Sequence, residues 1–178
     1  MKNIEDFFLR TLITSPRFLS KDPVDDQKLL FPAFADKLKQ SIAIYQQTHP
    51  DHNITFSETY RSNTLQGIHF NNGASKIKKD GMHHYGIAVD CIFIIGGKRT
   101  FKGDVNLLRS IHKKNGLTIL GTWDALHVQF IPVSDQAQLR KDVVNKILAF
   151  QKTNNLPQTG EPDKATITKA KQIFKATP

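Results

Sequence analysis

The apolar run at residues 88–95 places the strongest limit on the fold of this chain. Its eight residues are apolar except for Asp90, and glycines flank it, with Gly86 before it and Gly96 and Gly97 after it. A run of this length between turn residues is typical of a buried β-strand. We therefore expect a core strand here that carries one carboxylate and ends in a tight turn.

Segments with helical and strand-like periodicity surround this run. Four apolar residues recur at helical spacing between positions 32 and 47, which predicts a helix there. The other predicted elements are a strand at Ile54–Tyr60, a short helix capped by Ser62, a loop at Asn71–Gly81, a helix at Asp104–Asn115 ended by Gly116, and short strands at Thr118–Leu120 and His127–Pro132. Helices and hairpin-like strands without regular alternation predict an α+β fold, with a small, mainly antiparallel sheet flanked by helices.

The composition changes after Pro132, and we place a domain boundary near residue 134. A polar amphipathic helix is predicted at 135–153, a break at 154–160 and a last helix at 163–175. Residues 135–178 are too few for an independent core, so this tail either packs on domain 1–134 or forms a marginal module.

Charge and hydropathy narrow the class of protein. The 178 residues carry a net charge of +9, which favours polyanionic partners, but basic and aromatic residues do not alternate as in nucleic-acid-binding segments. No apolar run is long enough to cross a bilayer, and the opening segment carries acids unlike a signal peptide. We expect a monomer made in the cytoplasm without a classical export signal. We expect it neither to bind nucleic acid nor to insert into a membrane.

The single cysteine, Cys91, lies within the apolar run and excludes an internal disulfide. A buried strand thiol is the expected role. A thiol peptidase in which His83 or His84 serves as the base is the alternative.

Two short clusters carry the side chains of a catalytic metal site. The segment 83–90 offers His83 and Asp90, and the segment 124–129 offers Asp124 and His127. A catalytic zinc ion takes three nitrogen or oxygen ligands from the protein and leaves a position for water. We therefore predict that His83, Asp90 and His127 bind Zn²⁺ and that Asp124 is the general base. Gly86 allows the tight turn that brings His83 to the strand of Asp90.

At these residues the sequence resembles the zinc peptidoglycan peptidases, which comprise D-alanyl-D-alanine carboxypeptidases and dipeptidases and L-alanyl-D-glutamate endopeptidases. Their pattern is H-x-x-G-x-A-x-D followed by (D/E)-x-x-H, and residues 58–62 with Gln66 resemble the family's strand-end arginine segment. The resemblance covers roughly residues 55–130. It implies a zinc cleft, the same three ligands, activation of water by Asp124, and stabilisation of the oxyanion by Arg61.

The resemblance also implies a reaction. We expect hydrolysis of a peptide bond in the peptidoglycan stem, with the L-alanyl-D-glutamate bond first and a bond to D-alanine second. Asp124 and Gln129 resemble the endopeptidase branch, whereas Gly81 and the position of Trp123 depart from the family and affect substrate contacts. A phage lysin released at lysis, or an effector delivered by a secretion machine, would reach the cell wall without a signal peptide.

The tail has a resemblance of its own. Residues 149–152, Leu156, Thr159, Asp163 and Thr166 resemble the later part of a helical peptidoglycan-binding repeat, although its first helix is not evident. This resemblance implies peptidoglycan as the partner. A helix pair that only covers the first domain is an equal alternative.

Each site residue has an alternative role. His84 is the alternative to His83 as the first ligand. The alternative role of Arg61 is a structural ion pair, and that of Asp124 is a loop cap. Core packing is expected for Trp123 and Tyr85, with the cleft wall as the alternative. A second hypothesis for the whole chain is a zinc-stabilised wall-binding domain without catalysis.

Overall fold

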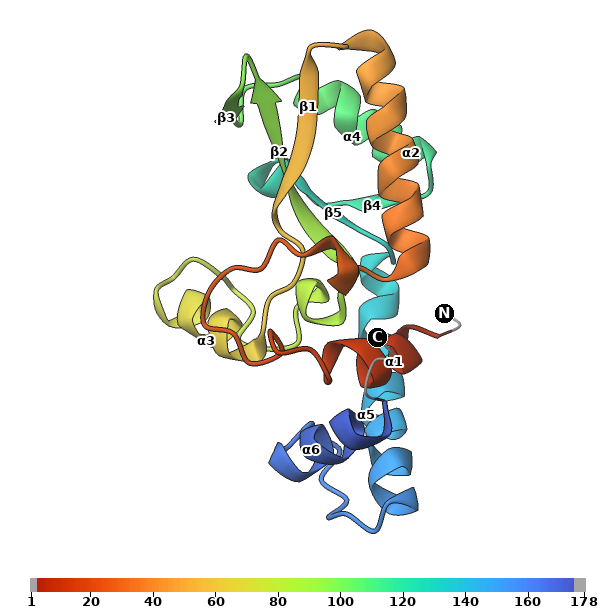
Figure 1. The fold of residues 1–178 in the computed structure, drawn as a ribbon. Coiled ribbons are helices and arrows are strands. Elements are labelled where there is room, and N and C mark those ends of the chain that lie inside the picture. The colour runs from red at the N-terminus through yellow and green to blue at the C-terminus, as the bar shows by residue number, and fades with distance from the viewer. Residues whose placement is uncertain (1–2, 175–178) are drawn as a thin grey trace.

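The structure, a computed structural model, describes residues 3–174 and confirms the predicted α+β class (Figure 1). A five-stranded sheet has the order β1-β2-β5-β4, with β3 also paired to β2. The elements in chain order are α1 (Ile4–Phe7), the π-helical turn η1 (Phe8–Leu12), η2 (Gln27–Leu29), α2 (Pro32–Thr48), β1 (His52–Glu58), α3 (Asn63–Asn71), η3 (Met82–Tyr85), β2 (Ala88–Ile95), β3 (Lys98–Thr100), α4 (Val105–Lys114), β4 (Thr118–Ile119), η4 (Thr122–Asp124), β5 (His127–Gln129), η5 (Val133–Asp135), α5 (Gln136–Thr153) and α6 (Lys164–Ile173).

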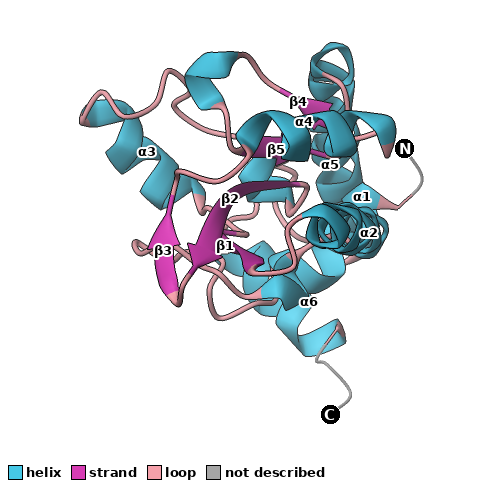
Figure 2. Cartoon of the chain, turned by 90° about the horizontal axis from the view of Figure 1, so that it is seen from above, coloured by secondary structure: helices cyan, strands magenta, loops and turns pink. Residues whose placement is uncertain are grey.

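Strand β2, the predicted apolar strand, is the centre of this sheet. All of its pairings are antiparallel. They place His52 of β1 opposite Ile95, and His127 of β5 opposite Asp90. Figure 2, seen from above, shows the strands side by side with α2 end-on beside them. The predicted small antiparallel sheet is therefore confirmed.

The two faces of β2 have different surroundings. Val89, Cys91 and Phe93 pack with apolar residues of α2 and α4 in one core cluster, which closes that face of the sheet. Because side chains alternate along a strand, Asp90 lies on the opposite face, beside its cross-strand neighbour His127. One face is thus core, and the other carries the Asp90 carboxylate next to His127.

Most predicted helix ends agree with the structure because they rest on capping residues. The side-chain oxygens of Ser62 and Asp104 accept hydrogen bonds from Leu65 and Leu107 at the starts of α3 and α4. Gly116, with φ of 70°, follows α4 as expected of a C-terminal glycine. The last helix ends at Ile173, and the predicted end at Lys175 lies outside the described residues.

The strand predictions were less accurate at their ends. Strand β5 stops at Gln129 and not at Pro132, and β1 covers 52–58 and not 54–60. Residues 82–85, expected in a loop, form the 3-10 turn η3, and the short strand β3 was not predicted. Each of these short pieces depends on cross-strand or tertiary partners that local periodicity does not contain.

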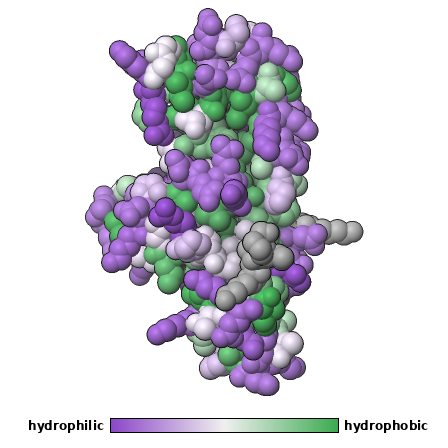
Figure 3. Space-filling view, in the orientation of Figure 1, coloured by the Kyte–Doolittle hydropathy of each residue, from purple (hydrophilic) through white to green (hydrophobic). Residues whose placement is uncertain are grey.

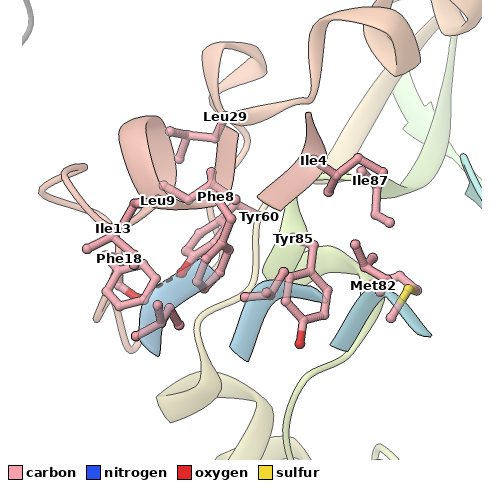
Figure 4. Close-up of a cluster of buried hydrophobic side chains, with 14 of the residues drawn as sticks. Ile4, Phe8, Leu9, Ile13, Phe18, Leu29, Tyr60, Met82, Tyr85 and Ile87 are labelled. Carbon is pink, nitrogen blue, oxygen red and sulfur yellow. Dashed lines mark hydrogen bonds between the residues drawn. The ribbon is translucent and has the colours of Figure 1, made fainter. Parts of the chain in front are cut away.

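The N-terminal helical segment was also not predicted, although it supplies much of a second core. Ile4, Phe8 and Leu12 are buried at helical spacing and pack against Tyr60 and Tyr85 (Figure 4). The cluster continues into the tail through its buried residues Leu139, Val143, Ile147, Phe150 and Ala170. The tail therefore packs on the rest of the chain. Whether residues 135–178 also act as a separate module stays a prediction.

Polar contacts fasten the tail as well. The ammonium group of Lys146 on α5 lies 2.5 Å from the carboxylate of Asp6, and Lys79 lies 3.2 Å from Glu161. Within the tail, the fully buried Gln151 donates to the hydroxyl of Thr166 and to the Glu161 carbonyl, which fixes the loop between α5 and α6. The tail is thus held to both the N-terminal segment and the loop before η3.

The surface seen in Figure 3 is mostly hydrophilic, with hydrophobic residues visible between β1 and α2. Within residues 3–174, no helix combines the length and the apolar character that a transmembrane span needs.

Gly86 occupies a position that no other residue is expected to fill. Its φ is 65°, and an added Cβ atom would lie 2.2 Å from the Leu29 carbonyl oxygen. We expect Gly86→Ala to lower the free energy of unfolding by about 2 to 5 kcal/mol. The cost of a left-handed backbone conformation for alanine adds to the cost of the clash between its Cβ atom and the Leu29 carbonyl oxygen. Gly96→Ala is the matched control, since Gly96 also has positive φ but open space around it. Thermal unfolding of both variants tests this, and equal losses would contradict it.

Candidate metal centre

Four segments deliver the predicted site residues to one end of the sheet. The turn η3 carries His83, and Gly86 in the left-handed conformation directs the chain from η3 into β2, which carries Asp90. Strand β5 brings His127 directly opposite Asp90, and the turn η4 ends at Asp124. Residues far apart in sequence are therefore placed by one strand pair and the two turns that precede its strands.

The donor atoms of the three predicted ligands converge on one point. His83 Nε2 lies 3.2 Å from His127 Nδ1, and Asp90 Oδ1 lies 3.4 Å and 3.1 Å from these two nitrogens. Ligand atoms about 2.0 to 2.1 Å from a zinc ion at tetrahedral angles are about 3.3 Å apart. The three spacings fit that geometry, and two imidazoles with one carboxylate are a donor set that zinc accepts.

The charge balance of this cluster favours an ionised Asp90. Burial raises the pKa of the Asp90 carboxyl group, but the adjacent imidazoles of His83 and His127 outweigh this effect and bring the pKa well below its ordinary value. Asp90 is therefore present as a carboxylate, which is the form that binds metal.

Asp124 lies beside the cluster without belonging to it. Its Oδ2 is 3.9 Å from His127 Nδ1, and its side chain is partly exposed at the cleft. The residue that precedes η4 is Gly121, and the Asp124 carboxylate accepts no hydrogen bond from any of residues 3–174. The loop-cap alternative thus finds no support, and the carboxylate lies at the cleft beside the His127 ring.

Arg61 follows β1 and reaches the same cleft. Its guanidinium forms an ion pair with buried Glu58, donates to the Gln66 side-chain oxygen, and lies 3.5 Å from Asp90 Oδ2. The expected ion pair is present, and its contact with Glu58 holds the guanidinium in place. The group also lines the cleft beside Asp90, and its role toward an oxyanion stays a prediction.

The cleft itself has a volume of about 420 Å³. Besides the site residues, its walls include Ser75, Lys76 and Ile77 of the loop before η3, and Leu120 and Trp123. Core packing was the wrong expectation for Trp123, because its side chain is 78% exposed and its indole lies over Gly121. The expectation was correct for Tyr85, which is buried. Sequence reasoning had placed neither Lys76 nor Ile77 at the cleft, because their loop has no periodicity.

The structure separates His84 from the cluster. Its ring is buried against Phe8 and Phe18, and its Nδ1 lies 3.2 Å from the Arg61 carbonyl oxygen. Burial lowers the pKa of His84 to about 4, so the ring is a neutral core residue at pH 7. His83, and not His84, is the imidazole that meets Asp90.

The thiol-peptidase alternative also fails on placement. Cys91 faces α4, where its Sγ is 3.9 Å from His112 Nε2, on the side of the sheet opposite to Asp90. Burial raises the pKa of the Cys91 thiol and lowers the pKa of His112 to about 4. Both groups are therefore neutral and enclosed, unlike an activated thiolate.

Comparison with known proteins gives one match. Residues 121–169 match the family model of a peptidoglycan-binding domain, less than a third of the chain. The match begins before η4, includes β5, and extends through α5 into α6. No curated protein matches the chain. The predicted partial peptidoglycan-binding tail is thus supported, and the match at residues 121–169 is consistent with cell-wall association.

Proposed function

We propose that the chain is a zinc-dependent peptidoglycan peptidase that hydrolyses a peptide bond in the stem peptide, with the L-alanyl-D-glutamate bond as the first candidate. One observation carries this proposal. The donor atoms of His83, Asp90 and His127 lie 3.1–3.4 Å apart, with Asp124 beside them in an open cleft. The peptidoglycan-binding match supplies the polymer on which such a site would act.

The donor set fits zinc, and zinc held by these three residues would supply Lewis acidity that polarises the scissile carbonyl and activates water. Asp124 accepts a proton from the attacking water and passes it to the departing amine, so that it ends the reaction as a carboxylate. Its partial exposure in the cleft leaves it accessible to both groups.

Arg61 and the cleft walls act on the substrate. The guanidinium, fixed by Glu58, stabilises negative charge that develops on the carbonyl oxygen. Trp123 and Ile77 are exposed apolar side chains on the cleft walls, where they bind the methyl groups of alanine residues. The net charge of +9 draws the chain to an anionic wall polymer.

A second candidate function is a zinc-stabilised wall-binding domain without catalysis. The observation that favours it is the peptidoglycan-binding match, which includes β5 and therefore His127 itself. In that case the metal would hold β2, β5 and η3 together and the cleft would bind a wall fragment. The Asp124 carboxylate accepts no hydrogen bond from residues 3–174 and lies at the cleft beside His127, which favours the enzyme over this alternative.

The two functions separate in one experiment. Purified protein is dialysed against zinc, its metal content is measured, and it is incubated with a defined stem peptide before mass spectrometry of the fragments. We expect one zinc per chain, release of L-alanine from the peptide, loss of turnover with chelator and recovery with added zinc. Release of D-alanine would assign the other bond. Zinc binding without turnover, on the peptide and on whole sacculi, would leave only the wall-binding function.

A further inference from the structure

The first turn of α5 is connected to a metal ligand by side-chain amides. Gln129 on β5 is 1% exposed, and its Oε1 lies 3.3 Å from His127 Nε2, on the far side of the ring from the cluster. The same oxygen accepts from Gln136 Nε2 at 3.3 Å. Gln136 is the first residue of α5, the helix that begins the tail.

The direction of each hydrogen bond follows from its neighbours. Gln129 Nε2 donates to the Ile131 carbonyl oxygen at 2.6 Å, so its oxygen must face His127 and Gln136. Arg140, one turn along α5, has only donors, and it faces Gln136 Oε1 at 3.5 Å, so the Gln136 N–H groups point to Gln129. An acceptor opposite His127 Nε2 requires a proton on Nε2. His127 Nδ1 faces His83 and lies 3.1 Å from the Asp90 carboxylate, which also only accepts, so Nδ1 offers its lone pair when a cation, and not a proton, lies between the two groups.

We propose that Gln129 and Gln136 are positioning residues that fix the tautomer and the ring orientation of His127, so that helix α5 of the tail is part of the metal centre. This inference rests on the proposed metal function. Imidazole ligands depend on such partners, because the group on the second nitrogen decides which nitrogen is free to bind metal.

A second contact strengthens the link between α5 and the site. Arg140 Nε donates to the Asp80 carbonyl oxygen at 3.1 Å, just before η3, the turn that carries His83. The first two turns of α5 thus contact both ligand-bearing segments, through Gln129 on β5 and through Asp80 before η3. Helix α5 therefore belongs both to the segment that matches a peptidoglycan-binding domain and to the surroundings of the proposed metal ligands.

Zinc affinity and the tautomer of His127 test this proposal. Gln136→Met keeps the length of the side chain and removes its N–H donors, and Gln138→Met, on the exposed side of the same turn, is the matched control. Nitrogen NMR of the zinc-loaded full chain at pH 8 is expected to show His127 protonated at Nε2, with the ring bound to zinc through Nδ1. Partners of this kind are worth about 10 to 100-fold in affinity, and because Gln136 acts through Gln129 we expect zinc binding about five to ten times weaker.

Each outcome decides the question. Loss of zinc affinity in Gln136→Met but not in Gln138→Met, with equal melting temperatures, supports the positioning role. A proton on His127 Nδ1 in the zinc-loaded wild-type chain, or zinc affinities of the two variants within about twofold of each other, overturns it. Zinc binding without hydrolysis in the wild type would instead reject the proposed enzyme and leave this inference standing. If the wild type binds no zinc, the metal function and this inference fail together, whereas equal zinc affinities of the two variants reject this inference alone.

Discussion

Replacing Asp124 by Asn is expected to lower the rate of stem-peptide hydrolysis by about 100 to 10,000-fold, the range typical of a lost general base. Asn has the same shape but cannot take a proton from water. Because the Asp124 carboxylate lies 3.9 Å from His127 Nδ1 and outside the ligand cluster, zinc content is expected to stay at one ion per chain. The measurement pairs turnover of a defined peptide with metal analysis of the same sample.

Asp51→Asn is the matched control for this variant. Asp51 is exposed at the start of β1, at the opposite end of the sheet from the cluster, so the same change of charge is made far from the cleft. Its turnover is expected to equal that of the wild type. Unchanged hydrolysis in Asp124→Asn would remove the assignment of Asp124 as base, and loss of zinc in that variant would make it a ligand instead.

The metal cluster is the part of the molecule that the sequence predicted best. The sequence motifs that predicted His83, Asp90 and His127 are short. Over such short distances along the chain, local backbone conformation determines where the side chains lie. Gly86 permits one turn, and alternation along β2 and β5 sets which side chains share a face. The structure brings these three together, although their binding of zinc stays a prediction.

The sequence was least informative where a residue's role depends on a distant partner. Trp123 looked like a core residue because nothing in its neighbourhood shows that the cleft opens beside it. Gln136 looked like an ordinary polar residue at a helix start, and its contact with Gln129 exists only after α5 has packed. Cys91 was compared with the nearby His83 and His84, whereas its neighbour in space is His112 on α4.

Removing the tail is expected to unfold the chain and not to leave an active catalytic domain. Four α5 side chains are buried in the same cluster as Ile4, Phe8 and Leu12, namely Leu139, Val143, Ile147 and Phe150. Each such side chain contributes about 1.5 to 3 kcal/mol, or about 6 to 12 kcal/mol together, against a typical total stability of about 5 to 15 kcal/mol. We expect a fragment of residues 1–134 to be insoluble or to lack a cooperative unfolding transition. A folded fragment with native zinc affinity would contradict this.

Adjacent valines on α5 allow the same test in the full-length chain. Val143 is 3% exposed within the cluster, whereas Val144 is 41% exposed. Val143→Asp places an unpaired carboxylate among apolar side chains and is expected to cost more than about 4 kcal/mol, enough to unfold many domains. Val144→Asp makes the same substitution at the surface and is expected to lower the free energy of unfolding by less than about 1 kcal/mol. Urea unfolding followed by circular dichroism measures both. If α5 were only an anchor tethered to an independent domain, Val143→Asp would leave the main transition in place. The difference between these neighbours therefore reports whether the tail shares one core with the segments that carry the proposed site.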